Sequence, residues 1–321
     1  MLFLGYDENE RKKVLGRSLK GMCAAEPGAF QEIITPYNYT LYRNDIEENR
    51  VAVIISGGGS YGPLFMGFVG KGLADVACEG DFDCAPSAYA LYHIAKIVHR
   101  AKGILFITNN YIGDFLNNDM AQELLQTENI DSRVCYVTDD MFSASGEPEA
   151  NRGGLCGVGV ITKIASAAAN TGMDLDGVYA VTRKAIERMR SVTVQYCEEK
   201  NVLEFGAGFS GEEPKLVLPY NGVDDMARQI YTCAMDELSV YFPKEVFFTI
   251  NRMRLLAYIE GFVITDSLKT CFEEADYKVA GCAVGAYFDA FSGSGCIATI
   301  LALDEELAKY LPVVRGYDFT I

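Results

Sequence analysis

Three consecutive glycines follow a strongly apolar segment of the chain and mark its first candidate site. Residues 53–70 read VIISGGGSYGPLFMGFVG, and we expect the glycine-rich part to join a buried strand to a helix. Glycine N–H groups are not shielded by a Cβ atom, so a polar ligand can approach them closely. The carboxyl end of a parallel strand is also where α/β sheets bind ligands. We therefore assign Gly57, Gly58, Gly59 and Ser60 as candidate ligand-binding residues.

Two other interpretations of the glycines stay open. Gly57, Gly59 and Gly62 satisfy the G-x-G-x-x-G pattern of dinucleotide-binding folds, although Pro63 follows the last glycine. That pattern also needs an acidic residue at the end of a second strand, whereas we expect helix and turn over residues 75–81. The alternative is a tight turn that requires positive φ angles. A Walker phosphate loop does not fit, because the later Gly-Lys pair is followed by glycine where Ser or Thr is needed.

A second candidate site follows the apolar run at residues 103–108. Asp114 lies in the predicted turn within TNNYIGDF, close to Asn110. If the strand at 103–108 neighbours the strand at 51–55, Asp114 projects from the same sheet edge as the glycines. A carboxylate in that place can take the proton of a bound hydroxyl group as a general base, with Asn110 as a further ligand contact. The other interpretation is an N-cap or Asx-turn aspartate.

Short apolar runs alternate with helical patterns along the first half of the chain. This alternation predicts an α/β fold in which a mostly parallel sheet is flanked by helices. The strands are expected near residues 39–43 and at 51–55, 103–108 and 133–138, and the helices at 8–24, 87–100, 119–127, 158–170 and 176–191.

The second half of the chain repeats this kind of order. Strands are expected at residues 192–198, 203–209, 245–250 and 279–287, and helices at 223–242 and 257–275. We place the boundary near residue 190, which gives an α/β domain over 1–190 and a second α/β domain over 191–321. A length of 321 residues, half of them hydrophobic, agrees with two domains.

Composition excludes several classes of partner. The net charge of −16 repels nucleic acid and anionic membrane surfaces, and no apolar run is long enough for a membrane helix. The ten cysteines are scattered singly and accompany two histidines, so we expect buried thiols and no metal site. Since the start of the chain has no signal-peptide pattern, we expect a cytoplasmic protein.

Several segments resemble the K subunit of dihydroxyacetone (glycerone) kinase, in the expected order and over most of residues 10–311. They are ISGGGSYGPLFMGFVGKG, APSAYALYHIAK, KGILFITNNYIGDFLN, GGLCGVGVITKIASAAANTG, LEFGAGFSGEEP and VGAYFDAFSGSGCIATILALDEEL. The resemblance implies two α/β domains, a homodimer and a bound small polyhydroxy metabolite. In that family, the carbonyl carbon of dihydroxyacetone is held on a histidine as a hemiaminal. Phosphate, from ATP with Mg²⁺ or from phosphoenolpyruvate, then arrives through a separate subunit, so no cofactor is implied for this chain.

This chain departs from the family pattern where the chemistry takes place. Tyr61 aligns with a loop histidine and Ser210 with the covalent histidine, whereas Asp114 matches the family aspartate. A serine hydroxyl needs an adjacent base to become a useful nucleophile, so Ser210 either hydrogen-bonds a ligand or fills a glycine-rich turn. Tyr61 is suited to donating a hydrogen bond, or it fills the space of the missing imidazole. In addition, NRMRLLA replaces an Asn-Asn-Leu-Gly turn, and Ser292 stands where the family has aspartate.

These departures favour a non-catalytic or regulatory homologue that binds a small hydroxy-ketone or polyol and acts through a partner, either an L-type kinase subunit or a transcriptional regulator. The alternative is an active K-type subunit that phosphorylates an altered C3 or C4 substrate, with Asp114 as base and phosphate from an L-type subunit. A third hypothesis is a binding protein that uses the dinucleotide-like loop. The remaining histidines, His93 and His99, lie on a predicted helix and align with no family histidine, so we expect them on its solvated surface.

Overall fold

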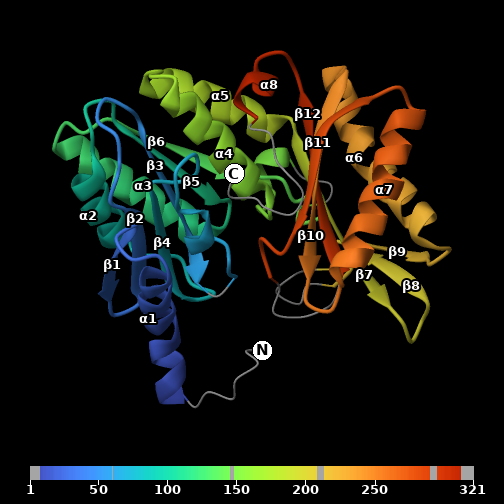
Figure 1. Cartoon of the computed structure of the whole chain (residues 1–321), viewed down its shortest axis with the longest axis horizontal. Coiled ribbons are helices and arrows are strands. Elements are labelled where there is room, and N and C mark those ends of the chain that lie inside the picture. Colours follow the sequence, from blue (N-terminus) through green and yellow to red (C-terminus); the bar gives the residue numbers. More distant parts are fainter. Residues whose placement is uncertain (1–7, 60, 145–147, 208–212, 290–294, 312–321) are drawn as a thin grey trace. The chain divides into compact units, whose positions relative to one another are not determined.

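The computed structural model describes residues 8–59, 61–144, 148–207, 213–289 and 295–311. Contacts divide the chain into two compact units, residues 1–136 with 165–182 and residues 137–164 with 183–321 (Figure 1). The units are interleaved along the chain because helices α4 (Gly157–Asn170) and α5 (Leu175–Glu187) each contribute residues to both. The domain boundary that we placed near residue 190 stays a prediction.

The first unit is built on a six-stranded sheet in the order β1-β2-β4-β3-β5-β6. Its strands are β1 (Phe30–Thr35), β2 (Asn38–Arg43), β3 (Ala52–Gly59), β4 (Val76–Phe82), β5 (Ile104–Asn109) and β6 (Ser132–Val137). The other elements are α1 (Glu8–Ala25), the 3₁₀ turn η1 (Met66–Phe68), α2 (Ala88–Val98) and α3 (Ile112–Thr127). The sheet is mixed, since β3 runs parallel to β4 and β5 whereas β2 pairs antiparallel with β1 and β4.

Strand β4 corrects the expectation of helix and turn over residues 75–81. Val76, Ala77 and Cys78 are fully buried, and register pairs β4 with β3 from Ile54 opposite Val76 to Gly57 opposite Glu79. The strand was not predicted because this short apolar run is flanked by two acidic residues, Asp75 and Glu79. Their charges are accommodated by specific partners that only the folded chain provides.

One face of the first sheet is covered by α2 and α3. Leu91 and Ile94 of α2 and Leu125 of α3 pack against Ile54 and Phe106 of the sheet. The helical spacing of the apolar residues in α2 accounts for this contact, because it gathers them on one side. Ser87 begins the helix, where its hydroxyl oxygen accepts a hydrogen bond from the Ala90 N–H at 3.3 Å.

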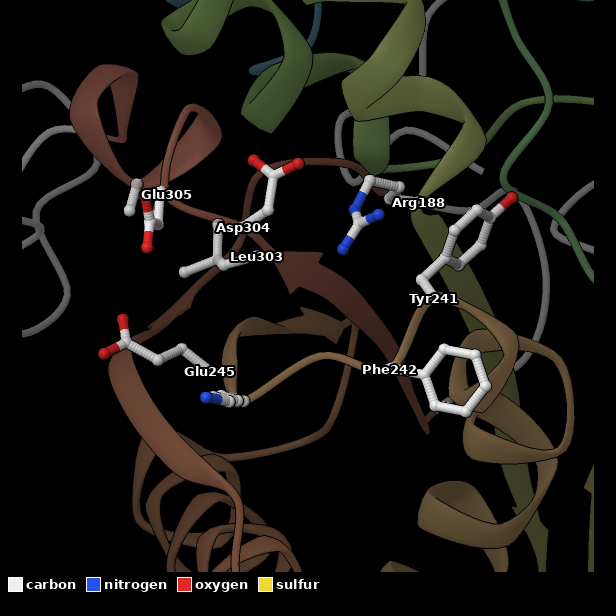
Figure 2. A pocket seen from close by; sticks show the side chains of 9 residues that line it. Arg188, Tyr241, Phe242, Glu245, Leu303, Asp304 and Glu305 are labelled. Carbon is white, nitrogen blue, oxygen red and sulfur yellow. The ribbon is translucent and has the colours of Figure 1, made fainter.

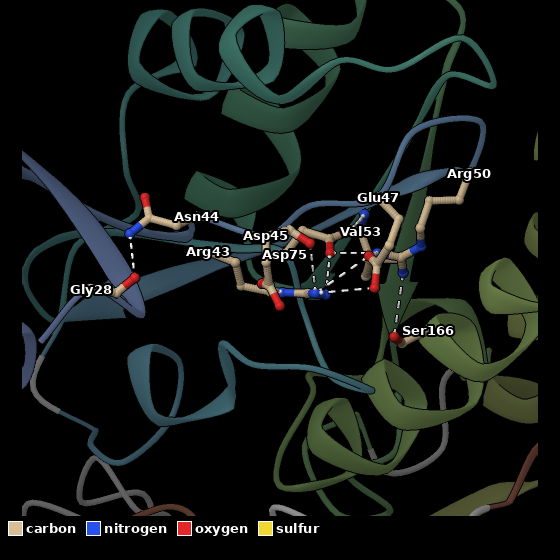
Figure 3. Close-up of polar contacts among 9 residues, drawn as sticks. All are labelled: Gly28, Arg43, Asn44, Asp45, Glu47, Arg50, Val53, Asp75 and Ser166. Atoms are coloured by element: carbon tan, nitrogen blue, oxygen red, sulfur yellow. Dashed lines mark hydrogen bonds and ion pairs between the residues drawn. The ribbon is translucent and has the colours of Figure 1, made fainter. Parts of the chain in front are cut away.

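A buried ion cluster joins the starts of β3 and β4 to the end of β2 (Figure 3). The Asp75 carboxylate lies 2.5 Å from Nη1 of Arg50 and 3.0 Å from Nη1 of Arg43, and it accepts the Val53 N–H at 2.8 Å. All four residues are buried. Because each charge has a partner of opposite sign, the cluster fixes the register of three strands without leaving an uncompensated buried charge.

The second unit is built on a six-stranded sheet in the order β11-β10-β12-β7-β8-β9. Its strands are β7 (Met189–Cys197), β8 (Val202–Phe205), β9 (Leu216–Pro219), β10 (Glu245–Met253), β11 (Lys278–Gly285) and β12 (Gly295–Leu303). The remaining elements are η2 (Glu149–Asn151), α6 (Val223–Leu238), η3 (Ser239–Tyr241), α7 (Tyr258–Glu274) and α8 (Leu307–Tyr310).

Strand directions in this second sheet differ from the mostly parallel sheet that the sequence suggested. Among the described residues, β10 pairs parallel with β11, but β10–β12, β12–β7, β7–β8 and β8–β9 are antiparallel. The short connection between β7 and β8 accounts for one of these antiparallel pairs, because short turns connect antiparallel neighbours. The class of two α/β units with helix-flanked sheets is confirmed, and the sheets are mixed.

Helices α6 and α7 cover one face of the second sheet, as Figure 1 shows. Ile230 of α6 and Leu268 and Phe272 of α7 pack with Phe248 and Ile300 of the strands. The helices predicted at 223–242 and 257–275 and the strands predicted at 192–198, 245–250 and 279–287 are confirmed in type. Strand β8 covers the start of the strand predicted at 203–209, of which residues 208–209 lie outside the described residues, and β9 and β12 were not predicted. Among the described residues, no helix is both long and apolar enough to cross a membrane.

Candidate functional site

The glycines of the first candidate site belong to strand β3 itself and do not form a loop between a strand and a helix. A Cβ atom on Gly57 would overlap the ring of Phe65, and one on Gly59 would lie 2.8 Å from the Gly80 carbonyl oxygen. Gly58 lies against the backbone of residues 83–84. Close packing of the following segment thus requires small residues here. No α-helix follows β3 directly, because η1 and then β4 come next, so the expected strand-to-helix connection is wrong.

Glu79, which sequence reasoning missed as a site residue, holds that following segment in place. It lies on β4 opposite Gly57, and its carboxylate accepts the backbone N–H groups of Phe65 at 2.9 Å and Met66 at 3.2 Å. Burial raises the pKa of Glu79 to about 7, and the two N–H groups oppose this shift. A glutamate next to an apolar run could have indicated a buried site residue. It was missed because helix and turn were predicted for this segment.

Tyr61 is buried, and its hydroxyl group donates a hydrogen bond to the Asp83 carboxylate. Its phenol is therefore held by this carboxylate. Ser60 lies outside the described residues, as do Ser210 and Ser292. Ligand binding by Ser60 stays a prediction, as do the alignments of Ser210 with the family histidine and of Ser292 with the family aspartate.

Asp114 lies in the first turn of α3, because this helix begins at Ile112 and not near residue 119 as expected. Its side chain is buried, with 6% of the residue exposed, and Oδ1 has no hydrogen-bond partner among the described residues. Burial raises the pKa of Asp114 to about 7, and the neighbouring Thr108 side chain opposes this shift in part. A carboxyl group that gains and loses its proton near neutral pH can act as a general base.

A polar cluster links Asp114 to the end of β3. Ser56 and Thr108 face each other across β3 and β5, and the Thr108 hydroxyl donates to the Ser56 carbonyl at 2.8 Å. The Asn118 amide donates to the Asp114 carbonyl at 2.9 Å and to the Ser56 hydroxyl at 3.2 Å. The expectation that Asp114 and the glycines share one sheet edge is confirmed, because β3 and β5 are parallel neighbours. Asn110 follows β5 directly and is half-buried.

In the second unit, the segment that replaces the family's Asn-Asn-Leu-Gly turn has a definite structural role. Asn251 is buried, and its side-chain oxygen accepts the N–H groups of Tyr287 at 2.8 Å and Phe288 at 2.9 Å. Its amide nitrogen donates to the Phe288 carbonyl at 2.8 Å. This side chain therefore fixes the backbone that follows β11.

The second unit also has a hollow of about 570 Å³, and none of the predicted site residues lines it (Figure 2). Arg188 stacks over the Tyr241 ring at 4.8 Å in this hollow. Two of the charges in its wall have partners, since Asp304 pairs with Lys184 and Glu245 with Lys278. The hollow is thus a mixed-charge surface without an evident preference for one ligand.

Among the described residues, no group of His, Cys, Asp and Glu side chains has the arrangement of a metal site. The absence of a metal stays a prediction. His93 is exposed on α2, where it stacks on Tyr89 at 6.0 Å, and His99 is half-buried at the end of that helix. The expected surface position is confirmed for His93.

The chain is a protein of two α/β units, each with a mixed sheet flanked by helices. In the first unit, a buried carboxyl group lies beside a strand that ends in glycines. The chain belongs to the Dak1 domain family, whose model matches residues 20–314. It is 30% identical over 278 residues to the dihydroxyacetone-binding subunit DhaK of a PTS-dependent dihydroxyacetone kinase from Listeria innocua, covering 83% of each chain. It is also 30% identical to a D-erythrulose kinase of Mycolicibacterium smegmatis, covering 81% of this chain and 47% of that protein.

Solved structures agree on the fold. The dihydroxyacetone kinase of C. freundii superimposes with a TM-score of 0.85 at 24% identity, covering 97% of this chain and 58% of that chain. A structure described as the dihydroxyacetone kinase operon co-activator Dha-DhaQ gives a TM-score of 0.82 at 22% identity, covering 92% of this chain and 95% of that one. The chain thus spans most of the subunit-sized relatives and about half of the longer kinases.

Proposed function

We propose that the first unit binds a small hydroxy-ketone or polyol at the carboxyl ends of β3 and β5 without a covalent bond. The buried Oδ1 of Asp114 carries this proposal, because it has no hydrogen-bond partner among the described residues. An unsatisfied buried polar atom costs about 1–3 kcal/mol, which a ligand hydroxyl group would relieve. The related proteins named for dihydroxyacetone and erythrulose support this class of ligand.

The side chains available in this chain favour non-covalent binding. His93 and His99 are the two histidines of the whole sequence, and they lie on and at the end of α2. The family resemblance aligns Ser210 with the covalent histidine, and a serine hydroxyl does not readily add to a ketone without a base. We therefore expect the ligand to keep its carbonyl group and to be held by hydrogen bonds.

We further propose that the chain acts as a non-catalytic or regulatory subunit, as a homodimer. Its ligand-bound form would be recognised by a partner, either an L-type kinase subunit or a transcriptional regulator. The likeness to a structure described as an operon co-activator supports the regulatory version of this role. In this version the ligand changes which partner is bound, and no phosphate is transferred.

One observation favours a second function, that of an active K-type subunit acting on an altered C3 or C4 substrate. The pKa of Asp114, raised to about 7, suits a base that takes the proton of a substrate hydroxyl. Phosphate would come through a partner subunit, from ATP with Mg²⁺ or from phosphoenolpyruvate. Positioning and charge stabilisation account for most of phosphoryl-transfer catalysis, so this activity does not need covalent capture.

Dihydroxyacetone labelled with ¹³C at its carbonyl carbon tests the binding proposal. We expect the NMR spectrum of the complex to keep a carbonyl resonance, whereas a hemiaminal would give a tetrahedral carbon resonance. Asp114→Asn should weaken binding by about tenfold, because Asn cannot accept hydrogen bonds at both positions. Glu123→Gln is the matched control, since it removes one charge from an exposed position on α3. A tetrahedral carbon, or equal affinities of both variants, would refute the proposal.

Activity with a supplied L-type subunit separates the two functions. The protein is mixed with this subunit, with ATP and Mg²⁺ or with a phosphoenolpyruvate-dependent phosphate donor, and with dihydroxyacetone, erythrulose or C4 polyols. The regulatory role predicts ligand binding without turnover. Turnover that falls at least a hundredfold in Asp114→Asn but not in Glu123→Gln would establish the catalytic role instead.

A further inference from the structure

A groove of about 550 Å³ lies between α1 and the hairpin of β1 and β2 in the first unit. It is separate in sequence from the site at β3 and β5, and its volume lies in the range of small-molecule sites. The described residues that line it are Lys13, Gly16, Arg17, Lys20, Ile34, Thr35, Pro36, Tyr37, Tyr39 and Asp81.

Three cations of α1 line this groove. Lys13, Arg17 and Lys20 are spaced i, i+4 and i+7, so they lie on one face of the helix and span about 10 Å along it. All three are exposed. Within the described residues, none of them takes part in an ion pair or a side-chain hydrogen bond. This unpaired positive stripe contrasts with the net charge of −16 of the whole chain.

Gly16 allows α1 to pack closely against the β1–β2 hairpin, which places the cations beside a groove. A Cβ atom at this position would lie 3.3 Å from Cγ2 of Ile34 and 3.5 Å from the Tyr39 ring. The missing side chain therefore lets α1 pack closely against the hairpin. Lys13 and Lys20 lie one turn to either side of Gly16, so the same contact brings them to the groove wall.

The hairpin supplies the groove with an exposed aromatic ring, and β4 supplies a carboxylate. Tyr37 is 69% exposed at the β1–β2 turn, where its φ angle is 67°. Asp81 is the one carboxylate among the described lining residues. It raises the pKa of Tyr39, which also lines the groove, although burial of that phenol is the larger cause. The groove thus combines cations, a ring face and an acceptor for hydroxyl or amino groups.

We propose that this groove binds a nucleoside di- or triphosphate. Phosphate groups would contact Lys13, Arg17 and Lys20, and the base would stack on Tyr37. A span of about 10 Å accommodates two or three linked phosphates better than a single one. Asp81 disfavours a ligand that is anionic throughout, but it accepts hydrogen bonds from ribose hydroxyl or base amino groups. The proposal does not depend on the ligand of the β3 and β5 site.

Calorimetry on the whole chain at low salt tests this site with ADP, pyrophosphate and adenosine. We expect ADP to bind more tightly than pyrophosphate, and adenosine to bind weakest. The triple variant Lys13→Gln, Arg17→Gln, Lys20→Gln should lose at least about tenfold in ADP affinity, since three charge-assisted contacts are removed. Tyr37→Ala should bring the affinity for ADP down to that for pyrophosphate.

The triple variant Lys200→Gln, Lys215→Gln, Lys309→Gln is the matched control. It changes the net charge equally at exposed positions of the second unit. The proposal is overturned if this control loses as much ADP affinity as the groove variant, or if wild-type protein binds ADP no better than pyrophosphate. It is also overturned if ADP fails to bind at millimolar concentration. Circular dichroism and thermal unfolding verify that each variant is folded.

Discussion

The Glu79 carboxylate accepts the backbone N–H of Phe65 at 2.9 Å, and the Phe65 ring in turn occupies the space that a side chain on Gly57 would need. Glu79 and Gly57 are themselves opposite each other on paired strands. One buried acid thus holds the segment after β3 against the strand end that carries the glycines. The conformation next to the candidate site consequently depends on the Glu79 side chain and on the absence of a side chain at residue 57.

Stability should depend on pH through Glu79. Its pKa rises from 4.5 to about 7 on folding, so the folded state binds the proton more tightly than the unfolded chain. The free energy of unfolding should therefore fall as pH rises from 4.5 to 7, by about 3 kcal/mol for this group. Glu79→Gln keeps an acceptor for the N–H groups and removes the titration, so urea unfolding across this range should show a shallower pH dependence. An unchanged slope would contradict the assignment.

Asp114→Asn should stabilise the free protein at pH 8. The pKa of Asp114 is raised from 3.8 to about 7 by burial, so at pH 8 the folded protein holds an ionised carboxylate in an unfavourable environment. We expect a gain of about 1–3 kcal/mol in the free energy of unfolding at pH 8. The gain should vanish below pH 4, and Glu123→Gln should show neither effect. Destabilisation at pH 8 would mean that Asp114 serves packing instead of ligand binding.

Loss of the buried ion cluster should be costly. Asp75→Ala leaves Arg43 and Arg50 buried without their shared partner, and we expect a loss of about 3–5 kcal/mol by chemical denaturation. Asp45→Ala is a sharp comparison, because Asp45 also contacts Arg43 at 2.8 Å but its side chain is 68% exposed. That change should cost less than about 1 kcal/mol. Similar losses in both variants would show that burial of the pair is not what matters.

Gly57→Ala should destabilise the first unit and disturb the segment that carries Phe65. The added methyl group would overlap the Phe65 ring, and overpacking of this kind costs about 1–3 kcal/mol. Gly70→Ala is the control, because a Cβ atom there meets nothing within 4 Å. Thermal unfolding measures both changes, and ligand titration should show weakened binding in Gly57→Ala. Equal melting temperatures for the two variants would rule out the packing explanation.

The sequence by itself determined the class of fold and the sheet edge at which Asp114 lies. Apolar runs at 51–55, 103–108 and 133–138 predicted buried strands, and the helical spacing in 87–100 predicted α2, because both patterns reflect local side-chain geometry. Motif resemblance further indicated the family. Asp114 was placed at the sheet edge of the glycines because parallel neighbours end at the same edge, and β3 and β5 are such neighbours.

Only the tertiary structure decided what the polar and small residues do. Strand β4 escaped prediction because Asp75 and Glu79 are charged, and their cost is offset by Arg50 and by the backbone of residues 65–66, which are distant in sequence. The glycines of β3 looked like a loop because sequence does not reveal that the Phe65 ring packs on Gly57. The groups that pair with a buried charge, or that pack against a glycine, come from distant parts of the chain. Local sequence patterns therefore do not predict these contacts.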